Sequence, residues 1–200
     1  MRSMSGTRAE ILEAAMRVFA RYGVRRSSMR DIAEEAGVSR QTLYNAFGSK
    51  DDLLRALIRH FTDQAIARIE AGLPACRDLG EQLDLVFAHM VVEGFELVRR
   101  TPNAAELLEG FNHAGRDEIA AAAARFTALI ERILAPHAPA LARAGLTPGA
   151  LAAFVQRAAK AVGAQARGRE ELTAQLATLR RLCRAAAGQP EGAQAAPGPD

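Results

Sequence analysis

The sequence contains few aromatic residues and few cysteines. Its 200 residues include no Trp, two Tyr and two Cys. Cys76 and Cys183 lie far apart in the sequence and cannot supply a disulfide framework or the four ligands of a zinc site. No apolar run reaches the roughly 18 residues that a membrane span needs, and the first residues lack the apolar segment of a signal peptide. These absences predict a cytoplasmic protein that makes no contact with a membrane.

Sequence signatures of catalysis are also missing. The chain has no Gly-x-Ser-x-Gly motif and no glycine-rich phosphate loop, and its four histidines are scattered. The sequence therefore predicts a protein that is not an enzyme, with no catalytic residues, no cofactor and no metal site.

Alanine is abundant, with 43 residues in the chain. It is the best helix former and a poor strand former, so the composition predicts an all-α fold. Apolar residues recur at helical spacing in about nine segments, separated by Gly, Pro and N-cap residues. The expected helices span residues 7–22, 28–36, 39–47, 49–71, 79–100, 104–112, 116–135, 147–167 and 170–187, and a loop is expected over 136–145.

The first three expected helices carry clear end signals. Thr7 and Ser28 each precede an acidic residue by three positions, as in a capping box. Gly37 follows the second helix, where a left-handed conformation costs glycine little, and Ser39 can cap the third. Two short helices joined this tightly predict a helix-turn-helix.

The net charge is unevenly distributed along the chain. Residues 1–60 have a balance of +4, whereas the other 140 residues have a balance of −1. A basic excess in the first third is expected if that part binds a polyanion, although an ordinary basic surface is the alternative.

The third expected helix has an unusual outward face. If Leu43 and Phe47 point to the core, the remaining positions form a hydrogen-bonding surface. Arginine pairs with guanine, and Asn or Gln with adenine, in the major groove of DNA. We therefore interpret this helix as a DNA-reading helix, with a merely solvated surface as the alternative. The outward side chains are Arg40, Gln41, Thr42, Tyr44 and Asn45.

The segment from Ser28 to Leu54 resembles the DNA-binding domain of TetR-family transcriptional regulators. The resemblance rests on Gly-Val-Ser…Thr-Leu-Tyr…Phe…Ser-Lys…Leu-Leu and extends over about a quarter of the chain, from Thr7 to Ile58. Ala46 departs slightly from the pattern, because a bulkier or polar residue is usual there. The resemblance implies that bases are read by Arg30, Arg40, Gln41 and Asn45, and that phosphates are held by Ser28, Thr42, Tyr44 and Lys50.

Lys50 also stands out by its residue type. The chain uses arginine almost everywhere and has only two lysines, Lys50 and Lys160. A compact ammonium at the start of a helix suits a phosphate contact, although chance is the alternative.

The resemblance further implies a domain order and a homodimer. We expect a helix-turn-helix DNA-binding domain over 1–50, a helical ligand-binding and dimerisation domain over 51–187, and a disordered tail over 188–200. A dimer would bind a palindromic operator in double-stranded DNA. The last two helices would pair with their copies, with an intramolecular core as the alternative. Their apolar residues are Leu151, Phe154, Val155, Ala158, Ala159, Val162, Leu172, Leu176, Leu179 and Cys183.

In the TetR family the middle helices enclose a small-molecule pocket. The polar stripe of His89, Glu93, Glu96 and Arg100 is more simply a solvated face than a set of metal ligands. The opposite face is apolar, which favours a mostly apolar effector; an ordinary core is the alternative. The candidate pocket residues are Phe87, Val91, Phe95, Phe111, Asn112, His113 and Phe126.

Together these features predict a homodimeric DNA-binding transcriptional regulator, a repressor released from its operator by a small effector. The alternative is a regulator without a small-molecule ligand that is constitutive or switched by a protein partner. Oxidation sensing by Cys76 is a further alternative.

Overall fold

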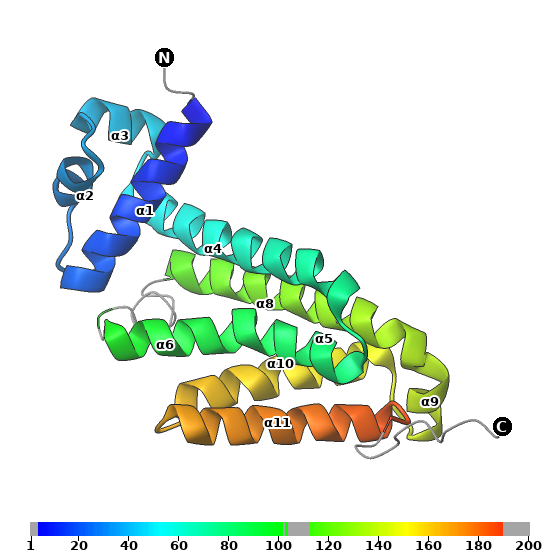
Figure 1. Cartoon of the computed structure of the whole chain (residues 1–200). Coiled ribbons are helices and arrows are strands. Elements are labelled where there is room, and N and C mark those ends of the chain that lie inside the picture. The colour runs from blue at the N-terminus through cyan, green and yellow to red at the C-terminus, as the bar shows by residue number, and fades with distance from the viewer. Residues whose placement is uncertain (1–3, 102, 104–112, 190–200) are drawn as a thin grey trace. The chain divides into compact units, whose positions relative to one another are not determined.

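The computed structural model describes residues 4–101, 103 and 113–189. All regular elements within these residues are helical, which confirms the predicted all-α class (Figure 1). The elements are α1 (Met4–Tyr22), α2 (Met29–Ala36), α3 (Arg40–Ala46), α4 (Lys50–Gly72), η1 (Leu73–Ala75), α5 (Leu79–Phe87), η2 (Ala88–Val92), α6 (Glu93–Arg100), α8 (His113–Leu134), η4 (Ala135–His137), α9 (Ala138–Arg143), α10 (Pro148–Gln165) and α11 (Arg169–Ala186).

The chain forms two compact units. Unit 1 combines the residues up to Ala65 with Gly94–Ala123, and unit 2 combines Ile66–Glu93 with the residues from Ala124 onward. Helices α4 and α8 each contribute to both units. The domain boundary expected after residue 50 falls at the first residue of α4, within unit 1.

Unit 1 has one apolar core that joins its first four helices. Phe19 of α1, Ile32 of α2 and Leu43 of α3 have no exposed surface. Tyr22, the last residue of α1, is exposed. The buried members of this core are Ile11, Leu12, Ala15, Val18, Phe19, Val24, Ile32, Ala33, Leu43, Phe47, Leu53, Leu54 and Leu57.

The helix ends agree with the sequence signals at most positions. Ser28, Ser39 and Thr147 are N-caps, and Gly23 and Gly37 have positive φ angles after α1 and α2. The predicted cap at Thr7 is wrong, because α1 already includes Met4. The same Thr-x-x-Glu spacing also places two side chains on one exposed face inside a helix, so the pattern alone does not mark a helix start.

The expected helix over 79–100 contains an irregular turn. α5 continues into η2, a five-residue π-helical segment, which continues into α6. A π segment adds one residue to a turn and rotates the following helix relative to the preceding one. Regular α-helical spacing therefore does not describe one continuous face from residue 79 to residue 100.

The prediction of a loop over residues 136–145 is wrong. These residues hold η4 and the short helix α9, and both begin with a proline within the first two positions. Proline is tolerated there because the first backbone N–H groups of a helix have no intrahelical partner. The predicted helix end at Gly168 is also displaced, since α10 ends at Gln165 and Gly168 is the N-cap of α11.

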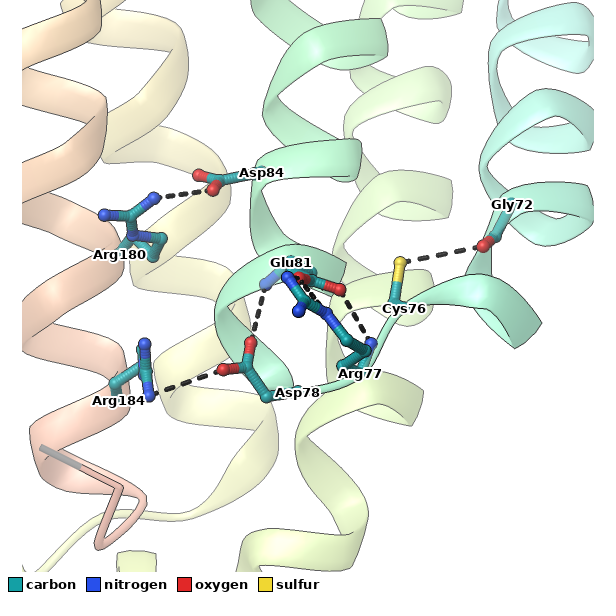
Figure 2. Close-up of polar contacts among 8 residues, drawn as sticks. All are labelled: Gly72, Cys76, Arg77, Asp78, Glu81, Asp84, Arg180 and Arg184. Carbon is teal, nitrogen blue, oxygen red and sulfur yellow. Dashed lines mark hydrogen bonds and ion pairs between the residues drawn. The ribbon is translucent and has the colours of Figure 1, made fainter. Parts of the chain in front are cut away.

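Helices α5, α10 and α11 pack together in unit 2. Leu83 of α5, Val155 of α10 and Leu172 of α11 have no exposed surface. Ion pairs join α11 to α5 and to its N-cap: Arg180 Nη1 lies 2.6 Å from Asp84 Oδ2 of α5, and Arg184 pairs with the N-cap Asp78 at 3.4 Å (Figure 2).

In the described part of the chain, no single helix combines the length and apolarity of a membrane span. One pair, Gly115–Arg143 with Pro148–Gln165, meets that test only when taken together and is bent by 110° at the break.

Candidate nucleic-acid interface

The start of α2 is held by a reciprocal cap. The backbone N–H of Ser28 donates to Asp31 Oδ2 at 2.8 Å, and the backbone N–H of Asp31 donates to Ser28 Oγ at 3.3 Å. The Asp31 carboxylate accepts hydrogen bonds from the backbone N–H and from the hydroxyl of Ser28, and these lower the pKa of Asp31 below its usual value. The cap therefore satisfies two backbone donors at the start of α2 within the chain itself.

The turn between α2 and α3 is short, and backbone and side-chain hydrogen bonds hold its conformation. Gly37 adopts a left-handed conformation with φ of 64°, and the N–H of Val38 donates to Ala33 O at 3.0 Å. Ser39 Oγ then accepts from the N–H of Thr42 at 3.0 Å and caps α3. Because only Val38 separates the glycine from this cap, α3 has little freedom to turn relative to α2.

The inner side of α3 is anchored in the core of unit 1. Leu43 is fully buried and Phe47 is 3% exposed. The guanidinium of Arg8 lies over the Phe47 ring, 4.2 Å from its centroid, and donates to Ala46 O at the end of α3. Sequence reasoning missed Arg8, because no local pattern links residues 38 positions apart.

The outer side of α3 carries the five side chains predicted to face outward, and all of them are exposed: Arg40, Gln41, Thr42, Tyr44 and Asn45. Tyr44 is 49% exposed. Gln41 Nε2 donates to Asn45 Oδ1 at 2.8 Å, which links two of the candidate base-reading residues. Arg40 makes no hydrogen bond or ion pair to another residue in the described part of the chain. Their role in base reading stays a prediction.

Three other predicted DNA contacts already have partners within unit 1. Arg30 Nε donates to Glu34 Oε1 at 2.7 Å in an exposed pair along α2. Ser28 Oγ donates to Asp31 Oδ2 at 2.8 Å, and Thr42 Oγ1 shares a 2.8 Å hydrogen bond with Ser39 Oγ. A DNA contact by any of these groups would therefore exchange or share an existing bond.

Lys50 has a structural position that the sequence did not indicate. Its ammonium donates to Val24 O at 2.8 Å and to Ser27 O at 3.0 Å. These bonds tie the start of α4 to the connection between α1 and α2. The predicted phosphate contact stays a prediction, and the two carbonyl bonds give this lysine a second role in stabilising the fold.

Ion pairs orient α2 against α1. Arg17 Nε donates to Glu35 Oε1 at 2.7 Å, and Arg21 lies 3.8 Å from the same carboxylate. The hydrogen bond from Arg17 is the largest cause of a pKa for Glu35 that lies below its usual value.

An apolar groove runs over α10 and α11 in unit 2. It has a volume of about 390 Å³, and Phe154 and Leu182 on it are 55% and 62% exposed. Sequence reasoning missed Leu182, which falls outside the regular apolar stripe of α11. The residues that line the groove are Leu146, Ala150, Leu151, Phe154, Leu179, Leu182, Cys183 and Ala186.

Much of the predicted dimer stripe is buried inside the chain itself. Val155, Ala159 and Leu172 have no exposed surface, and Leu176 and Cys183 have almost none. Ala158 and Val162 are half-buried. The exposed part of this surface is thus shifted toward Phe154 and Leu182.

The candidate effector residues differ in their surroundings. Phe87, Val91 and Phe126 are buried, and Phe95 is half-buried with Arg99 above its ring. His113 is exposed and lies 2.9 Å from Asp117. Phe111 and Asn112 lie outside the described residues, as does the helix expected over 104–112.

Cys76 lies beside the polar groups at the start of α5, and its thiol is directed toward Gly72 (Figure 2). Its thiol donates to Gly72 O at 3.6 Å. Burial raises the pKa of this thiol, and the nearby carboxylates of Glu81 and Asp78 raise it further. A thiol held in its protonated form is a poor nucleophile, which argues against oxidation sensing at Cys76.

A second hollow of about 390 Å³ lies between the start of α5 and the end of α8. Leu73, Leu129 and Ile133 contribute its apolar wall. Its two arginines are paired: Arg77 with Glu81, and Arg132 with Glu70 at 2.5 Å. The hollow therefore has no unpaired arginine with which to attract an anion.

Two residues of the polar stripe, His89 and Glu93, lie in a chain of polar contacts. His89 Nδ1 lies 2.7 Å from Glu93 Oε1, whose other oxygen accepts from Arg68 at 2.9 Å. Nowhere in the described ranges do three or more His, Cys, Asp or Glu side chains gather as a metal site.

The N-terminal segment of the chain matches a known protein family. The family profile described as "Bacterial regulatory proteins, tetR family" matches residues 11–57. The "HTH-type transcriptional repressor KstR2" of Mycobacterium tuberculosis is 40% identical over 65 residues, which cover 32% of each chain. The chain thus spans about a third of the length of this curated relative.

Solved structures are similar over most of the chain. A putative TetR-family transcriptional regulator from Rhodococcus sp. has a TM-score of 0.68 at 23% identity, covering 87% of this chain and 96% of its own. The transcriptional regulator FadR from Bacillus subtilis, solved in complex with stearoyl-CoA, has a TM-score of 0.65 at 22% identity, covering 88% and 96%. At these identities the likeness concerns the fold.

Proposed function

We propose that this chain is a member of the TetR family of bacterial regulatory proteins and acts as a homodimeric transcriptional repressor released from a palindromic operator by a small effector. We place it in the cytoplasm and assign it no enzymatic activity. The observation that carries the proposal is the outward face of α3, where Arg40, Gln41 and Asn45 are exposed on a helix whose inner side is buried.

The chemistry of this face suits double-stranded DNA. Arginine and amide side chains match the hydrogen-bonding edges of guanine and adenine in the major groove. The caps at Ser28 and Ser39 and the buried Leu43 hold α3 in one orientation, so the protein need not order it on binding. The exposed hydroxyl of Tyr44 is available to a phosphate beside the reading face.

A second copy of the chain is the occupant that we propose for the apolar groove over α10 and α11. Phe154 and Leu182 are among the few large apolar side chains exposed in the described part of the chain, and the groove they line is almost entirely apolar. Surfaces of this kind mark association sites. Two copies related by a two-fold axis would present two reading helices to two half-sites of a palindrome.

The effector we propose is small and mostly apolar. The FadR structure with stearoyl-CoA shows that one protein of this fold holds an amphipathic ligand. In the present chain, the candidate residues Phe87, Val91 and Phe126 are buried and apolar, so a ligand reaching them would have to displace packed side chains. Ligand-free control, constitutive or through a protein partner, is the alternative.

DNA binding is tested by selection from a pool of randomised duplexes, followed by competition measurements. The wild-type protein should enrich a palindrome. Arg40→Ala should lose about 1–3 kcal/mol of discrimination at one base pair in each half-site. Arg157→Ala, which changes an exposed arginine of α10, is the matched control and should retain full discrimination. Enrichment of no sequence by the wild type would refute the proposal.

The dimer is tested by light scattering after size-exclusion chromatography. Phe154→Glu and Leu182→Glu should each convert a dimer into a monomer, because either change introduces a charge into an apolar contact. Arg143→Glu, an exposed change on α9, should leave the dimer intact. A wild-type protein that is monomeric at micromolar concentration would contradict this part of the proposal.

Effector release is tested with stearoyl-CoA and free stearate as probes. A ligand should raise the melting temperature and weaken operator binding in a gel-shift assay. Release by a protein partner, with no response to any member of a panel of apolar metabolites, would favour the ligand-free alternative.

A further inference from the structure

The two amide side chains on the outward face of α3 are hydrogen-bonded to each other. Gln41 and Asn45 are one helical turn apart, and Gln41 Nε2 donates to Asn45 Oδ1 at 2.8 Å. Both residues are exposed. Side chains at this spacing meet on a helix surface, and such a bond stabilises the helix modestly.

This hydrogen bond decides what each amide presents to DNA. An isolated Asn or Gln reads adenine with its own oxygen and its own nitrogen together. In the pair, the Asn45 oxygen already accepts from Gln41, so Asn45 presents mainly its two N–H donors. The Gln41 nitrogen has given one hydrogen to Asn45, so Gln41 presents mainly its oxygen acceptor.

Neighbouring side chains do not compete for the pair. The Thr42 hydroxyl is engaged by Ser39 at 2.8 Å. Arg40 makes no hydrogen bond or ion pair to another described residue, and as a donor it could bond only an amide oxygen. The caps and the buried Leu43 hold α3 in one orientation relative to the first four helices, so the backbone positions of Gln41 and Asn45 are held as well.

We propose that Gln41 and Asn45 read neighbouring base pairs as one element of fixed polarity, with a donor edge opposite Gln41 and an acceptor edge opposite Asn45. This inference rests on the proposed DNA-binding function and specifies its operator chemistry. In the major groove, adenine N6 or cytosine N4 supplies the donor, and guanine N7 and O6 or thymine O4 supplies the acceptor. Two adenines, the expectation for independent amides, are therefore disfavoured at these positions.

The decisive experiment changes one residue and reads the base preference opposite the other. Randomised duplexes are selected with the wild type and with Gln41→Met, which keeps a long unbranched side chain but removes the amide. Released from Gln41, the Asn45 amide can read adenine with both of its groups. The preference opposite Asn45 should therefore move from guanine or thymine to adenine by about tenfold, although residue 45 is unchanged.

A second variant tests the polarity directly. Asn45→Asp retains an oxygen that accepts from Gln41 but replaces the outward donors with a second acceptor. It should shift the preferred base opposite residue 45 toward cytosine or adenine. Arg143→Ala, which changes an exposed residue of α9, is the control and should leave both preferences unchanged.

The outcomes separate this inference from the function it rests on. If the wild type selects an operator but Gln41→Met alters only the base pair opposite residue 41, the two amides read independently and the inference is wrong. Selection of adenine at both positions by the wild type would overturn it as well. If the wild type selects no sequence, the proposed function itself fails.

Discussion

The backbone of Gly163 in α10 lies so close to Val91 in η2 that a Cβ on the glycine would come within 2.5 Å of Val91 Cγ1. Real Cβ atoms do not approach other carbons this closely. Val91 is β-branched and buried, so its side chain has little freedom to move aside. The π segment and α10 can pack at this distance only because residue 163 is glycine.

We expect Gly163→Ala to destabilise the protein even though alanine is the better helix former. Overpacking of this kind costs about 1–3 kcal/mol. The gain in helix propensity offsets about 1 kcal/mol of that cost. Urea denaturation should show a lower midpoint with an unchanged slope.

Two variants check the cause of that loss. Val91→Ala combined with Gly163→Ala should recover part of the stability, because the smaller side chain leaves room for the new methyl group. Gly6→Ala, at a helical position with open space around it, should be neutral or slightly stabilising. A Gly163→Ala protein as stable as the wild type would show that η2 and α10 can separate at little cost.

Lys50 should contribute to the stability of unit 1 as well as to DNA binding. Lys50→Met leaves Val24 O and Ser27 O without the donor that lies 2.8 and 3.0 Å away. Losing a charged donor to two carbonyls should cost about 1–3 kcal/mol. Thermal denaturation without DNA measures this effect separately from any phosphate contact.

The other lysine provides the matched control. Lys160→Met also removes an ammonium group, but one whose pKa is lowered by burial, so the folded state disfavours its charge and the melting temperature should not fall. If Lys50→Met melts like the wild type yet binds every DNA sequence more weakly, the phosphate contact is its main role.

Unit 1 should lose stability in acid. Asp31 and Glu35 have folded-state pKa values lowered by the hydrogen bonds from Ser28 and Arg17, and the pKa of Asp52 is lowered by Ser49. As the pH falls, the unfolded chain takes up protons first, near 4.5 for Glu and 3.8 for Asp. The stabilisation is therefore complete above these values and decreases below them.

Chemical denaturation at several pH values tests this dependence. The stability difference between the wild type and Glu35→Gln should shrink as the pH falls from about 5 to about 3. Glu13→Gln, which changes an exposed residue of α1, should show no such trend. A difference that grows in acid would contradict the assigned hydrogen bond from Arg17.

Both cysteines should be poorly reactive in the folded protein. Burial raises the pKa of Cys183 to about 11, and burial together with Glu81 and Asp78 raises the pKa of Cys76. At neutral pH, alkylation by iodoacetamide should be slow at both residues and faster at the half-buried Cys76. Denatured protein, in which both thiols react quickly, provides the reference. Rapid labelling of native Cys76 would revive a redox role.

Local signals in the sequence predicted the helix-turn-helix formed by α2 and α3 well. Ser28, Gly37 and Ser39 each act through atoms one to five residues away, so their effect on the backbone is visible in the sequence. The outward orientation of Gln41 and Asn45 followed from the helical period once Leu43 was placed in the core.

The features that the sequence did not reveal depend on distant partners. The carbonyls that Lys50 binds lie 23 and 26 residues away, and Arg8 meets the end of α3 across 38 residues. The π turn at Ala88–Val92 packs against α10, and no periodicity in residues 79–100 indicates this contact. The burial of Val155 could not be predicted either, because the sequence does not show which helices lie against α10.

If α3 reads DNA as proposed, its length limits how much sequence one copy of the chain can recognise. Seven residues span about 10 Å, which is the height of about three base pairs. A given three-base-pair sequence occurs by chance roughly once in 64 positions, far too often to mark one site among the million or more in a genome. Most of the selectivity of this protein would therefore reside in the spacing at which two such helices are held apart. A ligand that altered this spacing by a few ångströms could abolish recognition without touching a single base contact.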